Sequence, residues 1–222
     1  MRTTDRLKLD AARRVLDFYS QNPEPDPSPA TVAALTRLQE QLARAESALE
    51  ENRAWQQGAV EALAERDAIT DSLRPHVLSL LRLAAFTAEH EGLADMRDRA
   101  RLTGMPRNSL AAIELAVEIA HEYQELLLAY GMPRDLQHTL REGLKQYREA
   151  DSRRVSCLVA ALAVAPDASV AAREAHLTIR HLDALKRLCL ASDPSRLSAW
   201  RAACTVRWRP GEETDGAAVE AS

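Results

Sequence analysis

Hydrophobic residues recur every three or four positions along most of this chain, the spacing of amphipathic helices. The first such pattern covers residues 4–20, and its apolar positions are Leu9, Ala12, Val15, Leu16 and Tyr19. It ends at the sequence QNPEPDPSPA, where closely spaced prolines favour an extended linker. Ser28 can then cap a second helix, and Pro29 suits its first turn. We predict that this second helix runs to about residue 73.

Within the second helix, a heptad pattern holds for two or three repeats and is then interrupted. Its members are Leu35, Leu38, Leu42, Ala45 and Leu49. Asn52 and Gln56 break the pattern before Val60 and Leu63 resume it. A short heptad run followed by a stutter indicates a bundle helix with coiled-coil character rather than an autonomous coiled coil.

Prolines and glycines divide the remaining sequence into further helices. Pro75 restarts the chain in an apolar helix that stops near Gly92, and a short charged segment follows. Further helices are predicted over residues 106–130, 133–164 and 167–191. Asp193 and Pro194 cap and open a last short helix.

The tripeptide GMP followed by arginine occurs twice, at residues 104–107 and 131–134. In each copy the glycine comes just after a helix, where a positive φ is needed, and the proline falls at the first position of the next helix. A duplicated unit would extend the similarity beyond the tripeptide, and a phosphate loop would need several glycines. Both copies are therefore interpreted as helix boundaries.

The composition favours helices over strands. Hydrophobic residues make up 46% and aromatic residues 4%, and only seven glycines interrupt a sequence dominated by Ala, Leu, Glu and Arg. We predict an all-α fold, an up-and-down bundle of four to five long helices with short accessory helices. The predicted divisions are an N-terminal helix (1–20), a Pro-rich linker (21–30), a helical bundle domain (31–206) and a disordered tail (207–222).

Charge and cysteine usage narrow the possible partners and the compartment. The net charge of −4 supplies no basic field, so nucleic acid is not the expected partner. Three widely separated cysteines, Cys157, Cys189 and Cys204, fit reduced buried thiols in a cytoplasmic protein. The amino terminus lacks the apolar core of a signal peptide. The longest apolar run, 157–165, is about half of the ~20 residues that a membrane span needs, and it is interpreted as a buried helix end.

Three segments, RRVLDFYSQNPEPDPS, YGMPRDL and DPSRLSAWRAACTV, are similar to segments of uncharacterised all-helical bacterial proteins. The resemblance covers most of the chain, and its motifs are helix boundaries rather than active-site signatures. It implies a helical bundle and no particular activity.

Glu118 and His121 have the Glu-x-x-His spacing of carboxylate-bridged di-iron bundles. At ~100° per residue, both point away from the apolar face of their helix. A second Glu-x-x-His is also missing. We interpret these residues as part of a solvated face and predict neither a metal nor a cofactor.

The main candidate for a binding site is a buried polar layer. Polar residues interrupt the apolar faces of helices 133–164 and 167–191; they are Asp151, Arg154, Glu174, Thr178 and His181. An antiparallel hairpin about Pro166 would place Asp151 near His181 and Arg154 near Thr178. Two interpretations stay open: a salt-bridged layer that fixes helix register, or a pocket in which Arg154 binds an anion and His181 exchanges a proton.

The carboxyl-terminal region carries basic residues beside Trp200 and Trp208, a combination that can stack on nucleic-acid bases. The basic residues are Lys186, Arg187, Arg196, Arg201, Arg207 and Arg209. Helix carboxyl ends favour basic residues in any case, and an acidic tail follows, so this partner is not preferred.

No catalytic motif is present, so interaction is the remaining functional class. The first helix, tethered by its linker, and the long second helix either pair with another chain or pack on their own bundle. We predict a non-catalytic cytoplasmic scaffold or protein-interaction module that contacts a protein partner or a second copy, without membrane contact. The alternative is a small-molecule or anion-binding protein that uses the polar layer.

Overall fold

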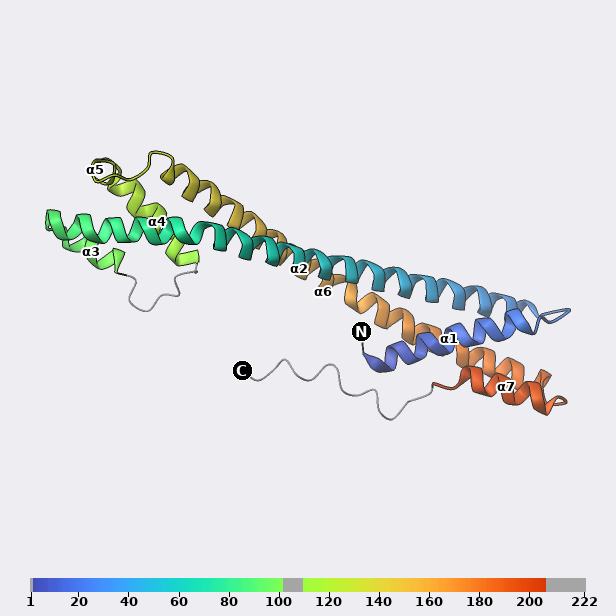
Figure 1. The fold of residues 1–222 in the computed structure, drawn as a ribbon. Coiled ribbons are helices and arrows are strands. Elements are labelled where there is room, and N and C mark those ends of the chain that lie inside the picture. Colours follow the sequence, from blue (N-terminus) through green and yellow to red (C-terminus); the bar gives the residue numbers. More distant parts are fainter. Residues whose placement is uncertain (1, 102–109, 207–222) are drawn as a thin grey trace. The chain divides into compact units, whose positions relative to one another are not determined.

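The computed structural model describes residues 2–101 and 110–206, and within them every regular element is an α-helix (Figure 1). In chain order the helices are α1 (Thr3–Gln21), α2 (Pro29–Glu91), α3 (Ala94–Ala100), α4 (Leu110–Glu122), α5 (Gln124–Ala129), α6 (Leu136–Cys189) and α7 (Pro194–Cys204). The all-α prediction is confirmed. The helices are uneven in length, since α2 has 63 residues and α6 has 54.

The helix boundaries predicted at Pro75 and Pro166 are wrong, because Pro75 lies inside α2 and Pro166 lies inside α6. A proline within a helix loses one backbone hydrogen bond and crowds the preceding turn, at a cost of about 3 kcal/mol. Packing on both sides offsets this cost. Leu73 and Val77 flank Pro75 and are 4% and 1% exposed, and each buried side chain of this kind contributes about 1.5–3 kcal/mol.

The antiparallel hairpin predicted about Pro166 therefore does not exist. Helices 133–164 and 167–191 are parts of the single helix α6. The buried alanines Ala161 and Ala168, on either side of Pro166, lie seven residues apart and so share one face of that helix.

The helix caps read from the sequence are confirmed. The Ser28 hydroxyl accepts a hydrogen bond from the Thr31 backbone N–H at 3.2 Å, at the start of α2. Asp193 accepts the Arg196 backbone N–H at 3.0 Å, at the start of α7. Helix α2 ends before Gly92, which has a φ of 70°.

The second GMP tripeptide follows its prediction only in part. Gly131, with a φ of 97°, comes just after α5 as expected. Pro133 precedes α6 instead of opening it, and its carbonyl accepts the Leu136 backbone N–H at 3.2 Å. The first tripeptide and the predicted tail 207–222 lie outside the described residues.

The chain divides into two compact units. Unit 1 comprises Met1–Ala54 and Ala160–Ser222, and unit 2 comprises Trp55–Val159. Helices α2 and α6 contribute to both units.

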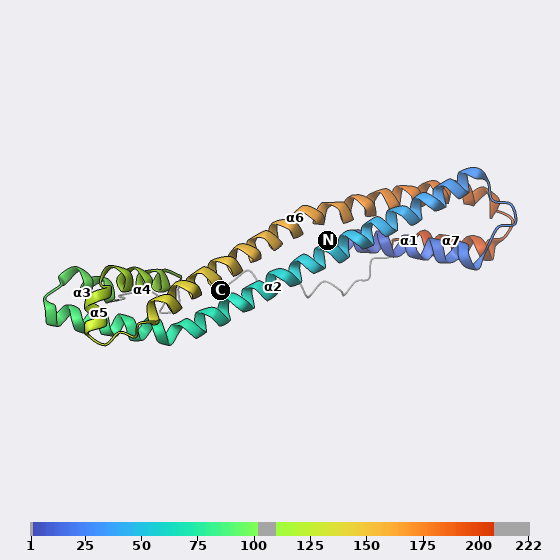
Figure 2. The same cartoon turned by 90° about the horizontal axis from the view of Figure 1, so that it is seen from above.

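In unit 1, α1 packs against the rest of its own unit. It lies beside α7 in both views (Figures 1 and 2). The shared core includes Val15, Leu38, Ile179, Leu182 and Trp200. The linker between α1 and α2 also contacts α6, because Glu24 forms an ion pair with the buried amine of Lys186.

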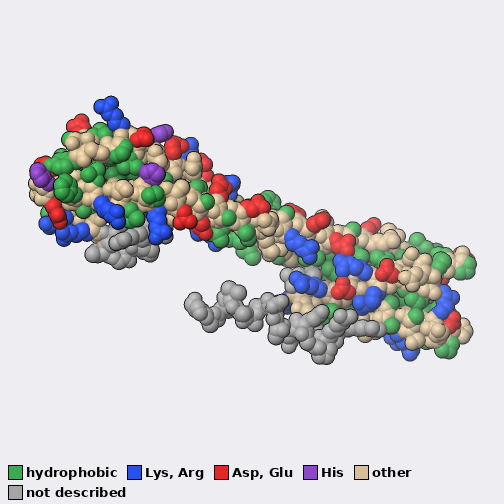
Figure 3. Space-filling view, viewed as in Figure 1, with side chains coloured by type: hydrophobic (Ala, Val, Ile, Leu, Met, Phe, Trp, Pro, Cys, Tyr) green, Lys and Arg blue, Asp and Glu red, His purple; other side chains and the backbone are tan. Residues whose placement is uncertain are grey.

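In unit 2, the short helices α3, α4 and α5 close a core against α2 and α6. The largest contributors to this core are Leu73, Val77, Leu80, Met96, Ile113, Ile119, Leu127 and Leu140. On the face shown in Figure 3, hydrophobic side chains also reach the surface between charged ones.

Candidate functional site

The polar layer predicted from the sequence does not form. The prediction required an antiparallel hairpin about Pro166, and α6 is continuous at that residue. Asp151 and Arg154 lie in the part of α6 that belongs to unit 2. Glu174, Thr178 and His181 lie farther along the same helix, in unit 1. Helix α6 therefore does not bring Asp151 to His181 or Arg154 to Thr178 across a turn.

In unit 1, two of the predicted site residues, Thr178 and Glu174, contact α2 instead. The buried Thr178 hydroxyl donates to Gln41 Oε1 at 2.9 Å. Glu174 forms an ion pair with Arg44 at 2.7 Å, whereas His181 is exposed. The contacts of Thr178 and Glu174 join α6 to α2.

In unit 2, Asp151 also pairs with α2. Its carboxylate lies 3.4 Å from the Arg66 guanidinium, which forms a closer ion pair of 3.0 Å with Asp67. The guanidinium also lies over the Tyr147 ring, 5.8 Å from its centroid. Arg154 is half-buried nearby on α6. This arrangement explains why the apolar face of α6 is interrupted at Asp151.

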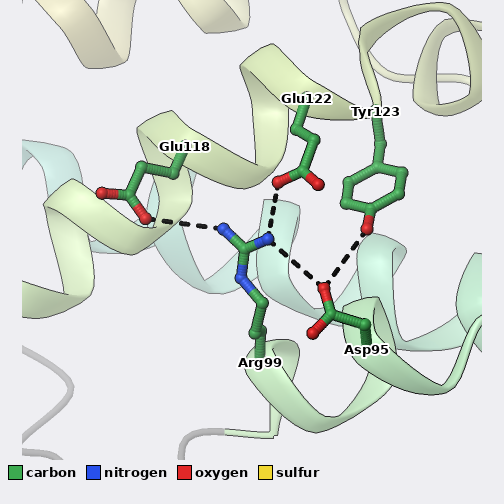
Figure 4. A network of polar contacts seen from close by, with 5 residues as sticks. All are labelled: Asp95, Arg99, Glu118, Glu122 and Tyr123. Atoms are coloured by element: carbon green, nitrogen blue, oxygen red, sulfur yellow. Dashed lines mark hydrogen bonds and ion pairs between the residues drawn. The ribbon is translucent and has the colours of Figure 1, made fainter.

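Glu118, the carboxylate of the Glu-x-x-His spacing in α4, belongs to an ion-pair network on Arg99 (Figure 4). Arg99 of α3 reaches Glu118 at 3.5 Å and Glu122 at 2.5 Å. Asp95 completes the ring around the guanidinium at 3.5 Å, and it accepts a hydrogen bond from Tyr123 at 3.4 Å. Among the described residues, no three His, Cys, Asp or Glu side chains are grouped so that they could hold a metal ion.

The basic and aromatic residues near the carboxyl end do not form a base-stacking surface within the described residues. Trp200 is 0% exposed and donates its indole N–H to Asp183 at 3.0 Å. Lys186 is also buried and pairs with Glu24, while Arg187 pairs with Asp183 at 2.7 Å. Arg207, Trp208 and Arg209 lie outside the described residues.

One partly buried histidine, His176, lies in an environment that disfavours its protonated form. Its Nδ1 is buried without a hydrogen-bond partner among the described atoms. Burial lowers the pKa of His176, and the charges of Lys8 and Arg180 lower it further.

Acidification is expected to destabilise the folded protein through this group. The unfolded histidine titrates near pH 6.5, and the folded one titrates below it, so the unfolded state binds the proton first. The free energy of unfolding, measured by urea titration, should therefore fall as the pH is lowered through about 6.5. His176→Gln should remove part of this slope and His181→Gln, at an exposed site, should keep it. Parallel slopes in wild type and His176→Gln would contradict the assignment.

Small residues bring α2 and α6 together in unit 2. A Cβ placed on Gly143 would lie 2.5 Å from a methyl carbon of Leu73, and one on Gly58 would lie 3.2 Å from the Cys157 sulfur. Ala59 and Ala62 are buried on α2. Small residues therefore fill the contact between α2 and α6. The larger apolar residues of this stretch of α6 lie outside that contact.

Those larger residues face outward. Val155, Leu158 and Val159 of unit 2 are 50%, 39% and 60% exposed. In unit 1, α6 likewise exposes Leu162 at 74% and Leu177 at 61%. The prediction that the apolar run 157–165 is a buried helix end is therefore wrong.

The exposed residues of unit 2 continue a regular pattern along α6. Arg141, Lys145, Arg148, Ser152, Val155 and Val159 are all exposed and are separated alternately by four and three residues. This is the spacing with which one helix lines up against another. We refer to these six residues as the α6 seam. The sequence interpretation missed it because that interpretation placed Val155 on the buried apolar face of helix 133–164.

Helix α6 also contains an 18-residue window with a mean hydropathy of 1.8, of which 22% is buried. By length and composition alone, this helix would suit a membrane span.

Comparisons with known proteins found no relative of this chain, which matches no protein-family model, no curated protein and no solved structure.

Proposed function

We propose that this chain is a non-catalytic interaction module that binds another protein through the apolar half of the α6 seam. The observation that carries the proposal is the exposure of Val155 and Val159, the apolar half of the seam, and of the adjoining Leu158. Neighbouring apolar side chains left in water are characteristic of protein contact surfaces. A partner helix that covers them gains about 25 cal/mol for each Å² of apolar surface removed from water.

The proposal includes a scaffold role for the two units. In unit 1, α1, the start of α2, the end of α6 and α7 share one core, which supports an up-and-down bundle of four helices. In unit 2, the close contact at Gly143 supports a rigid α6. A rigid helix loses little conformational entropy on binding, which favours its use as a docking element. We place this function in the cytoplasm.

A single charge in the apolar half of the seam, which consists of Val155 and Val159, tests the proposal. Val159→Asp should abolish capture of the partner by the full chain, because burying an unpaired carboxylate is costly. Val60→Asp is the matched control, since Val60 is also 60% exposed but lies on α2. The measurement is quantitative mass spectrometry of proteins retained by wild type and each variant.

The expected result is one or more proteins retained by wild type and by Val60→Asp but lost from Val159→Asp. All three chains should unfold within about 0.5 kcal/mol of one another, because both substitutions are at the surface. Equal retention by wild type and Val159→Asp would overturn the proposed function.

A further inference from the structure

We infer that the partner segment is an acidic amphipathic helix, with carboxylates opposite the basic half of the α6 seam and apolar residues opposite the other half. This inference rests on the proposed function and specifies the chemistry of the partner. It stands on the positions, exposure and pairing of charged residues in unit 2.

The basic half of the seam consists of Arg141, Lys145 and Arg148, all exposed. Among the described residues, Arg141 and Lys145 have no ion-pair partner, and Arg148 pairs with Glu114 at 2.7 Å while remaining 62% exposed. A hollow of about 750 Å³ lies over this stretch, and its lining includes Leu144 and one acid, Glu149. The hollow offers a place for acidic side chains above a partly apolar floor.

Helical phase joins the two halves into one surface. Arg141, Arg148 and Val155 are each seven residues apart, so they lie on one side of α6 with little rotation between them. A partner helix that covers Val155 and Val159 therefore also passes over the cations. Carboxylates on that helix would be complementary, whereas cations would be repelled.

The charge pattern argues against a second copy of this chain as the occupant. No position of the seam is acidic. A parallel copy would place Arg141 against Arg141, and an antiparallel copy would place cations against Val155 and Val159. Neither arrangement neutralises the cations, so the complementary partner is a different, acidic sequence.

Two synthetic helical peptides of about three heptads each provide the probes. In the first peptide, the positions that would face the seam are Glu in one half and Leu in the other half. A second version of this peptide has the reversed sequence. The second peptide has Gln in place of Glu. Binding to the full-length protein is measured by fluorescence anisotropy at low and at high salt.

The acidic peptide should bind in one direction, more tightly than the Gln peptide and more weakly as salt rises. Arg141→Glu with Lys145→Glu should weaken the acidic peptide about tenfold or more and leave the Gln peptide nearly unchanged. Arg74→Glu with Arg82→Glu makes the same charge change at exposed positions of α2 and should have little effect.

Equal affinity for both peptides, insensitive to the seam charge reversal, would overturn the acidic partner while leaving the apolar docking intact. Binding that survives Val159→Asp but not the charge reversal would instead overturn the apolar docking of the proposed function. A mixed-sequence oligonucleotide that displaces the acidic peptide at low concentration would overturn the acidic helix in favour of nucleic acid.

Discussion

Replacing Trp200 with alanine should destabilise the protein by about 3–5 kcal/mol, the range for deleting a large buried side chain. Trp200 is 0% exposed and its ring packs edge-to-face on Phe18 and Tyr19, with centroids 5.3 Å and 5.6 Å away. Its indole N–H also donates to Asp183 at 3.0 Å. The substitution would remove a core side chain, two aromatic contacts and a hydrogen bond from unit 1.

Urea unfolding followed by far-ultraviolet circular dichroism measures this loss. Trp200→Phe keeps an aromatic ring but not the donor, so it should cost less, about 1–2 kcal/mol. Trp55→Ala is the control, because Trp55 is 39% exposed and should cost far less. Equal effects at Trp200 and Trp55 would contradict the described core of unit 1.

Gly143→Val should destabilise unit 2 by about 2–3 kcal/mol through overpacking. A Cβ at this position would lie within 2.6 Å of both methyl carbons of Leu73 and 2.9 Å from its Cγ. Leu73 is only 4% exposed, so its side chain has little room to move away. Helix α6 or α2 must shift, or Leu73 must adopt a strained rotamer.

A double-mutant cycle assigns this effect to the contact itself. Leu73→Ala alone leaves a cavity. The double variant should lose about 1–3 kcal/mol less unfolding free energy than the sum of the losses in the two single variants. Helix propensity does not account for the expected loss, because valine is a better helix former than the glycine that it replaces. Additive effects of Leu73→Ala and Gly143→Val would show that α2 and α6 do not meet at Gly143.

The sequence predicted local features well where one side chain decides the outcome. Ser28 and Asp193 cap helices because their oxygens accept backbone N–H groups two or three residues ahead. Gly92 and Gly131 adopt positive φ because glycine alone does so without strain. Such features depend on a few neighbouring residues, which the sequence displays directly.

The prolines misled the prediction because their effect depends on distant packing. A helix break at Pro75 or Pro166 saves about 3 kcal/mol locally, but it would misalign the buried residues on either side. Only the structure shows that those residues continue one core face, with Leu73 and Val77 as the example in α2. The error at Pro166 then produced the polar layer, which depended on the hairpin.

The outward-facing residues of α6 were missed for a related reason. An apolar run such as 157–165 is usually buried, and the sequence does not show that small residues occupy the facing side. Gly58 on α2 lies close to Cys157, and a Cβ at that position would be 3.2 Å from the Cys157 sulfur. Val155 and Val159 are thereby left exposed, on the side away from that contact.

Site-specific photo-cross-linking at Val159 tests the central claim most directly. A photoreactive phenylalanine analogue at Val159 of the full chain, produced in its native cells, should form a discrete cross-linked product with an acidic protein. The same analogue at Val60, which is equally exposed on α2, should not form that product, and Val155→Asp should reduce its yield at Val159. Identical products at both positions, or none at Val159, would contradict the claim that α6 carries the docking surface.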